Sequence, residues 1–169
     1  MSALIAYNKP PLSKQLQKVS DYFIALSNST ESLITNLKLQ KLVYYAQSWH
    51  LALYGEPLFD EDFEAWVHGP VIPTLYNTYR DFKWNPILRD DLNDKSLIEL
   101  AKEINHDEFL EAIVDEYFRM GAFALEKSTH SEDPWIDARH GLPADAPCNE
   151  IITKDSLVKY YKQFVINGE

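Results

Sequence analysis

Hydrophobic positions in the first third of the chain recur at the three- and four-residue steps of α-helices. Between residues 16 and 27 they predict one helix, which the polar stretch Asn28-Ser29-Thr30 ends. A longer pattern starts after Thr35 or Asn36, either of which can cap a helix, and continues to Gly55. Apolar residues also cover the other sides of this second segment, so we expect it to be the buried central helix.

The pattern then changes to turns, short strands and shorter helices. Residues 63–68 predict one strand that Gly69-Pro70 closes, and Ile151-Ile152 predicts a second strand able to pair with it. Further helices are expected from Pro73, over 95–104, from Asp107 to about residue 121, and after residue 153. Residues 129–135 are interpreted as a polar loop around one tryptophan.

The predicted fold class is therefore mainly α: a single compact helical domain with at most a small two-stranded β element. We place this domain at residues 16–166, behind an N-terminal extension of residues 1–15. The length of 169 residues suits one domain, and 46% hydrophobic with 13% aromatic residues is far from a disordered composition. Four Trp and ten Tyr suit a core and an interface equally well.

Charge adds information about partners. The formal net charge is −10, and residues 81–116 alone contain 11 acidic and 4 basic residues. Such a surface repels phosphate backbones and anionic membranes, so neither a nucleic acid nor a membrane is expected as a partner. A basic partner protein and plain solubility both remain open as explanations.

Signals of catalysis and metal binding are weak. The lone Cys148 forms no internal disulfide, and the histidines lack ligand spacing, so neither a metal nor another cofactor is expected. No apolar run is long enough for a membrane span, which indicates a soluble cytoplasmic protein. Glu64 is either a general base or a carboxylate that bonds Tyr44 or Tyr45. An acid–base or metal enzyme using Glu64, His68 and His130 is the alternative from a different class of function.

Three ordered blocks carry a family resemblance. They are NLKLQKLVYYAQSWH at residues 36–50, GEPLFDEDFEAWVHGPVIP at 55–73 and STHSEDPW at 128–135. These blocks resemble the Panacea domain of SocA-like antitoxins, found in phage-associated and toxin–antitoxin proteins. A closing segment near residues 151–161 resembles the last helix of the family, so the likeness spans roughly residues 16–164.

The resemblance implies a non-enzymatic antitoxin, a small and mostly helical protein that neutralises a cognate toxin protein by direct binding. Family members are paired with unrelated toxins, so the identity of the toxin is not implied. One branch of the family hands its toxin to a AAA+ protease, which makes a proteolytic adaptor the alternative. The sequence lacks a recognisable additional DNA-binding domain, so autorepression through DNA is not expected.

Two surfaces are candidates for partner binding. One is acidic, and reversing its charges is expected to slow association with a basic toxin. The other joins the 68–70 turn to the 129–135 segment; alternatively Trp66 and Trp135 pack in the core. The candidate binding residues are His68, Asp81, Asp90, Asp91, Asp94, His130 and Trp135. The motif residues expected to form the scaffold are Leu39, Lys41, Leu42, Tyr44, Tyr45, Trp49, Glu64, Trp66, Gly69 and Pro70.

Overall fold

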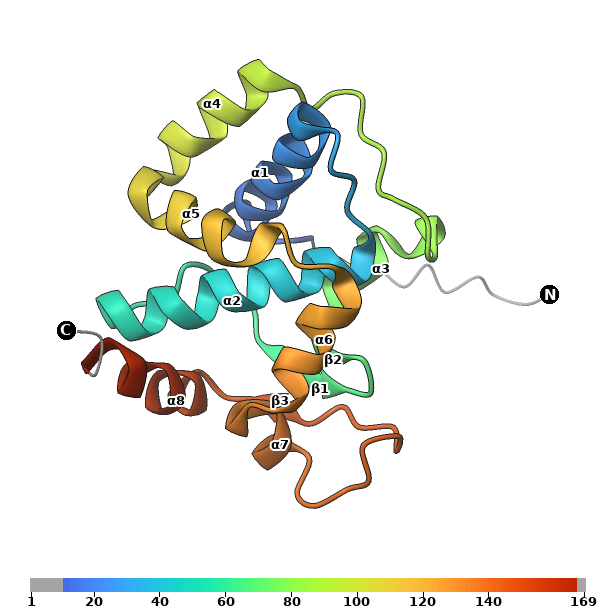
Figure 1. Ribbon diagram of the computed structural model, residues 1–169, viewed down its shortest axis with the longest axis vertical. Helices are drawn as coiled ribbons and strands as arrows, with labels where there is room; N and C mark the ends of the chain where they lie inside the picture. The colour runs from blue at the N-terminus through green and yellow to red at the C-terminus, as the bar shows by residue number, and fades with distance from the viewer. Residues whose placement is uncertain (1–10, 167–169) are drawn as a thin grey trace.

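The long helix α2 (Asn36–Tyr54) runs through the middle of the computed structural model, which describes residues 11–166 (Figure 1). It starts where the Thr35 hydroxyl accepts a hydrogen bond from the Lys38 N–H, and it ends at Gly55, whose φ is 71°. Helices α1 (Lys14–Thr30) and α8 (Lys154–Ile166) pack on two of its sides. The expectation of a buried central helix is confirmed.

Shorter helices complete the fold. In chain order they are α3 (Pro73–Thr78), α4 (Asp94–Ile104), α5 (Asp107–Ile113), α6 (Ala122–His130) and α7 (Asp133–Ala138). A 3-10 turn, Arg80–Phe82, follows α3, and a π-helical turn, Val114–Phe118, continues α5. The mainly α fold class is confirmed, and the buried apolar side chains form one continuous cluster. None of the helices in residues 11–166 combines the length and apolar character needed to span a bilayer.

Two boundaries differ from the sequence-based expectation. Residues 129–135 do not form a loop, because α6 continues to His130 and α7 starts at Asp133. Pro134 suits the first turn of α7, since no intrahelical partner is needed for its missing N–H there. Helix α1 begins at Lys14, two residues before its expected start, where Ser13 caps it. It also continues through residues 28–30, which were expected to end it. Of the expected extension, residues 1–10 lie outside the described residues.

The sheet has three strands rather than two, in the order β2-β1-β3. Strand β1 (Phe63–Trp66) pairs antiparallel with β3 (Ile151–Ile152), as expected, and also with β2 (Gly69–Val71). The two-strand limit was wrong because Gly69-Pro70 does not end the strand region but starts β2 after a two-residue turn. Proline is tolerated in β2 because β2 is an edge strand with one side outside the sheet.

Gly69 brings the backbone of β2 into direct contact with two helices. Its φ is +98°, a region that favours glycine, and a Cβ there would lie 2.7 Å from Lys41 Cε and 2.8 Å from Thr129 Oγ1. Lys41 belongs to α2 and Thr129 to α6. The β1–β2 hairpin therefore rests on α2 and α6 without an intervening side chain.

The Gly69→Ala substitution is expected to lower the free energy of unfolding by about 2–3 kcal/mol, through backbone strain and overpacking. Urea denaturation followed by circular dichroism measures this loss. Gly55→Ala is the matched control, because Gly55 also has a positive φ of +71° but no atom within 4 Å of the new Cβ. Equal losses in the two variants would contradict the close contact at Gly69.

Candidate functional site

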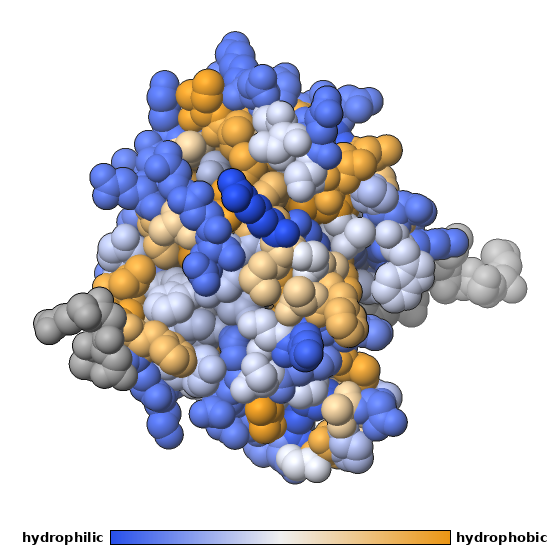
Figure 2. All heavy atoms as spheres, in the orientation of Figure 1, coloured by the Kyte–Doolittle hydropathy of each residue, from blue (hydrophilic) through white to orange (hydrophobic). Residues whose placement is uncertain are grey.

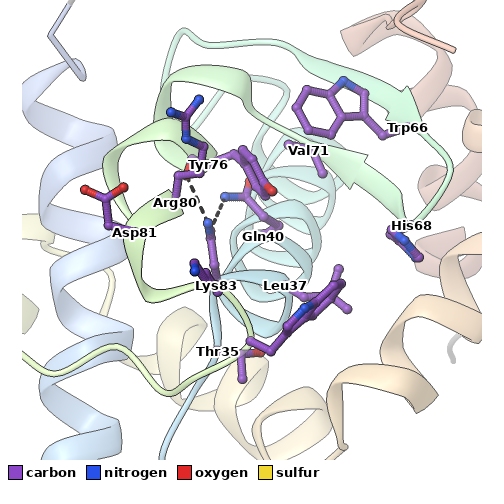
Figure 3. A pocket seen from close by; sticks show the side chains of 12 residues that line it. Thr35, Leu37, Gln40, Trp66, His68, Val71, Tyr76, Arg80, Asp81 and Lys83 are labelled. Carbon is purple, nitrogen blue, oxygen red and sulfur yellow. Dashed lines mark hydrogen bonds between the residues drawn. The ribbon is translucent and has the colours of Figure 1, made fainter. Parts of the chain in front are cut away.

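A cleft of about 480 Å³ lies between the β1–β2 hairpin, the start of α2 and the turn after α3 (Figure 3). Trp66 and His68 of the hairpin face Lys83 of the turn across this cleft, and Leu37 and Gln40 of α2 lie between them. The complete lining is Thr35, Asn36, Leu37, Gln40, Trp66, His68, Val71, Tyr76, Arg80, Asp81, Lys83 and Trp84. Its size falls within the range of pockets that receive a ligand or an anchoring side chain.

Buried amides hold the floor of the cleft. Gln40 is fully buried; its side-chain oxygen accepts a hydrogen bond from Ile72 N–H (3.0 Å), and its nitrogen donates to Asn36 Oδ1 (3.0 Å). The Asn36 side chain in turn donates to the Tyr76 carbonyl (2.9 Å). Since these buried polar groups have partners, α2, the end of β2 and α3 are fixed relative to one another.

The walls of the cleft are aromatic and cationic. Trp66 donates its indole N–H to Glu64 Oε2 (2.6 Å) and packs edge-on against Tyr76, with ring centroids 5.1 Å apart. Trp84 is 77% exposed at the rim. Arg80 also lines this cleft. Trp, Tyr and Arg are the residue types that contribute most often to the energetic centres of protein–protein interfaces.

A second, more open depression of about 620 Å³ lies beside the same hairpin. It shares Trp66 and His68 with the cleft and adds Glu64 and the 147–149 segment. His68 is exposed at the turn, where its Nδ1 lies 3.1 Å from Glu126 Oε1. The tip of the hairpin is therefore accessible from both depressions.

The hairpin is held from below by buried polar groups. Lys41 is fully buried and donates to the Pro70 carbonyl (3.0 Å), and burial lowers the pKa of this amine to about 7. Trp135 donates its indole N–H to the Trp66 carbonyl (2.8 Å), and His130 stacks on Trp135 with ring centroids 4.1 Å apart. Burial also lowers the pKa of His130.

Arg139 joins the hairpin to the loop that follows α7. This guanidinium, only 2% exposed, donates to the carbonyls of Ala65 (2.8 Å), Pro143 (2.8 Å) and Ala146 (2.5 Å). It also lies over the Trp135 ring, with Cζ 4.6 Å from the centroid. Arg139 is thus the shared support of β1, the 143–146 loop and Trp135.

A buried carboxyl links three helices on another side of α2. Glu132, 6% exposed, accepts hydrogen bonds from the hydroxyls of Tyr45 (3.0 Å) on α2 and Tyr161 on α8. Glu132 itself directly precedes α7. Burial raises the pKa of this carboxyl from 4.5 to about 7, although the two tyrosine hydroxyls oppose the shift.

This raised pKa predicts a pH dependence of stability. The folded protein holds the Glu132 proton more tightly than the unfolded chain, so the contribution is full below pH 4.5 and is lost as the pH rises through 7. Between pH 5 and pH 7 we expect this carboxyl to lower the free energy of unfolding by about 2 kcal/mol. Glu132→Gln keeps a neutral acceptor and removes this decline. Denaturant titrations at several pH values test the difference; parallel curves for both proteins would contradict it.

The structure separates the predicted partner-binding residues. His68 and Asp81 line the cleft, whereas Trp135 is buried under the hairpin and His130 is half-buried there. The expectation that the 68–70 turn and the 129–135 segment lie together is confirmed, because Gly69 lies against Thr129. The alternative expectation was that Trp66 and Trp135 pack in the core. It holds for Trp135, which is 4% exposed, whereas Trp66 is half-buried. A binding role for these residues stays a prediction.

The other three acidic candidates lie outside the lining of the cleft. Asp90 and Asp91 are exposed in the segment before α4, and Asp94 is the first residue of that helix. Asp91 Oδ2 accepts a hydrogen bond from Arg89 (2.5 Å), and Asp94 accepts one from the Ser29 hydroxyl of α1. The acidic surface and the cleft are therefore two distinct candidate surfaces.

The motif residues lie mainly inside the fold. Leu39, Lys41, Leu42, Tyr44, Tyr45, Gly69 and Pro70 are buried, while Trp49, Glu64 and Trp66 are half-buried. The expected bond from Glu64 to Tyr44 or Tyr45 was wrong: Glu64 accepts from Trp66, and the Tyr45 hydroxyl bonds Ser128 and Glu132. Glu64 points outward from β1 and so cannot reach the tyrosines of α2.

The three residues of the alternative acid–base enzyme do not converge on one site. Glu64 bonds Trp66, His68 contacts Glu126, and His130 stacks on Trp135. Within residues 11–166, no group of three or more His, Cys, Asp or Glu side chains is arranged to hold a metal ion.

Sequence reasoning missed several residues of the site. Trp84 is not among the predicted site residues, although it lies between Lys83 and Asn85-Pro86, outside any helical pattern. That position, a large aromatic in a polar turn, was the available signal. Arg139 and Glu132 were also missed, because only the fold brings their partners to them.

Comparison with known proteins assigns this mainly helical fold, with its small antiparallel sheet, to a family. The model of the antitoxin SocA-like, Panacea domain matches residues 39–136. Antitoxin SocA of Caulobacter vibrioides (strain NA1000 / CB15N) is 32% identical over 138 residues, covering 75% of this chain and 73% of that relative. No solved structure matches the chain. The chain therefore belongs to the antitoxin SocA-like, Panacea domain family, and the resemblance of the three sequence blocks is confirmed.

Proposed function

We propose that this protein is a non-enzymatic antitoxin that acts in the cytoplasm and neutralises a protein toxin by binding it directly. The observation that carries the proposal is the 32% identity to Antitoxin SocA, which extends over most of both chains. The acidic net charge of −10 is consistent with a protein partner rather than a nucleic acid.

The cleft is the surface best suited to the toxin. It combines a rigid floor with the aromatic rings of Trp66 and Trp84 and the Arg80 side chain, and it stays accessible at the 77% exposed Trp84. Rigid aromatic groups lose little conformational entropy when a partner covers them. The acidic residues 90–94 are the competing surface. The depression beside them is smaller, about 290 Å³, and no aromatic side chain lines it, so we assign the cleft as the primary contact.

The decisive experiment is co-expression with the open reading frame beside the gene. Expression of that neighbour alone is expected to stop growth, and co-expression of this chain is expected to restore it. The two purified proteins are then expected to form a complex in size-exclusion chromatography. A neighbour that is harmless alone, or toxicity that this chain does not relieve, would refute the antitoxin proposal.

Two further arms separate the mechanisms. Direct neutralisation predicts rescue and unchanged toxin levels in a strain without the AAA+ protease, whereas a proteolytic adaptor loses rescue there.

Replacing Asp90 and Asp91 by Lys tests the acidic surface, because a basic toxin would then associate more slowly at low salt. Unchanged association after this reversal would leave the cleft as the contact.

A further inference from the structure

Two histidines meet at the end of α2 that is farther from the cleft. His50 lies in the last turns of α2, and His106 directly precedes α5. Their Nε2 atoms are 3.3 Å apart, and the rings are nearly perpendicular at 84°. His50 is 5% exposed and His106 is half-buried, so the pair can be reached from solvent on the His106 side.

The tautomer of His50 is fixed by its other nitrogen. Nδ1 lies 2.6 Å from the Glu56 carbonyl, which can only accept a hydrogen bond, so Nδ1 carries the proton. The lone pair of the neutral ring is then on Nε2, which faces His106. Burial lowers the pKa of His50 and so favours this neutral form. A histidine whose Nδ1–H is held by a carbonyl is the usual arrangement of a metal ligand.

The separation also suits a shared ion. Two nitrogens at about 2.0–2.1 Å from a tetrahedral zinc lie about 3.3–3.4 Å apart. The observed Nε2–Nε2 distance of 3.3 Å matches this spacing. Tyr54 and Phe109 pack around both imidazoles, with centroids 4.8 and 5.5 Å from His50, and keep the rings in place.

We propose that His50 and His106 bind one divalent transition-metal ion through their Nε2 atoms, and that this ion is Zn²⁺. No third His, Cys, Asp or Glu side chain of residues 11–166 joins this pair, so water completes the coordination. Imidazole ligands select zinc, copper and nickel over magnesium and calcium. The ion joins the end of α2 to the start of α5 and stabilises the fold, independently of the antitoxin proposal and of the cleft.

The test uses the tag-free full chain after treatment with a chelator. Isothermal titration with Zn²⁺ alone is expected to show one ion per chain, together with a rise in Tm. NMR of the imidazole nitrogens is expected to show a large shift at Nε2 of both histidines and an unchanged proton on Nδ1 of His50. A wild-type protein that binds no Zn²⁺ would overturn the proposal and leave the pair as a hydrogen bond.

Variants assign the ion to this pair. His106→Phe keeps an aromatic ring against Tyr54 and Phe109 but offers no ligand, and it is expected to abolish both zinc binding and the rise in Tm. If this variant does not fold, His106→Gln replaces it. The control His140→Asn removes an exposed imidazole elsewhere and is expected to bind one zinc ion. Unchanged binding by His106→Phe, or lost binding by the control, would contradict the site.

Discussion

Replacement of Trp84 by Ala is expected to weaken toxin binding by about 30-fold to 1,000-fold, which corresponds to about 2–4 kcal/mol for an interface hot spot. The physical reason is that Trp84 is 77% exposed in the free protein and lies at the rim of the cleft, so a partner that enters the cleft covers a large aromatic area. Because the ring is mostly in water, its loss is expected to change the free energy of unfolding by less than about 0.5 kcal/mol. Surface plasmon resonance against the immobilised toxin, with urea denaturation of both proteins, measures the two effects.

Phe123→Ala is the matched control for this experiment. Phe123 is also 77% exposed, but it belongs to α6 and does not line the cleft. It is therefore expected to retain wild-type affinity. The opposite result, with affinity lost in Phe123→Ala and kept in Trp84→Ala, would move the toxin to a different surface.

Replacement of Arg139 by Ala is expected to lower the free energy of unfolding by at least about 4 kcal/mol, a large part of the roughly 5–15 kcal/mol typical of a domain. Three carbonyls, those of Ala65, Pro143 and Ala146, lose their donor, and Trp135 loses the cation over its ring. The cavity left by a side chain that is 2% exposed adds to the cost. The measurement is chemical denaturation, together with the soluble fraction after expression.

Arg139→Lys keeps the charge but offers a single ammonium in place of the planar guanidinium. Its free energy of unfolding is therefore expected to lie between those of the wild type and Arg139→Ala. Arg80→Ala serves as the control on the surface, since Arg80 is exposed. A loss of less than about 1 kcal/mol in Arg139→Ala would show that the three carbonyls find other partners.

The parts of the fold that depend on local sequence were predictable. The helical spacing between Thr35 and Gly55 identified α2 because the cap, the apolar positions and the terminal glycine all agree. The third strand was not predictable in the same way. Gly69-Pro70 is a strong turn signal, but the chain continues as β2 because residues 69–71 pair antiparallel with residues 64–66 of β1.

The candidate site was predictable only in part. His68 and Asp81 were selected and do line the cleft, but they were assigned to two different surfaces. Asp90, Asp91 and Asp94 were grouped with Asp81 because they are close in sequence and share a charge. The fold places them outside the cleft, since the chain turns away after the 3-10 helix to reach α4 (Figure 1). Charge along a sequence does not show which face a segment presents.

Figure 2 shows one face on which apolar and polar residues alternate in small areas rather than forming one broad apolar surface. If the toxin binds at the cleft, as proposed, such a surface favours recognition through a few large side chains, such as Trp84, more than through total contact area.

The support beneath the hairpin has a thermodynamic consequence for recognition. Lys41, Trp135 and Arg139 hold the backbone of the hairpin before any toxin arrives. If the toxin binds at the cleft, as proposed, association requires no coupled folding of this hairpin, and the heat-capacity change on binding should reflect only the surface that is covered. In a variant with a loosened hairpin, only a fraction of the molecules would hold the hairpin in its binding conformation. The apparent association constant would be the wild-type value multiplied by that fraction, although the substituted residue never touches the partner.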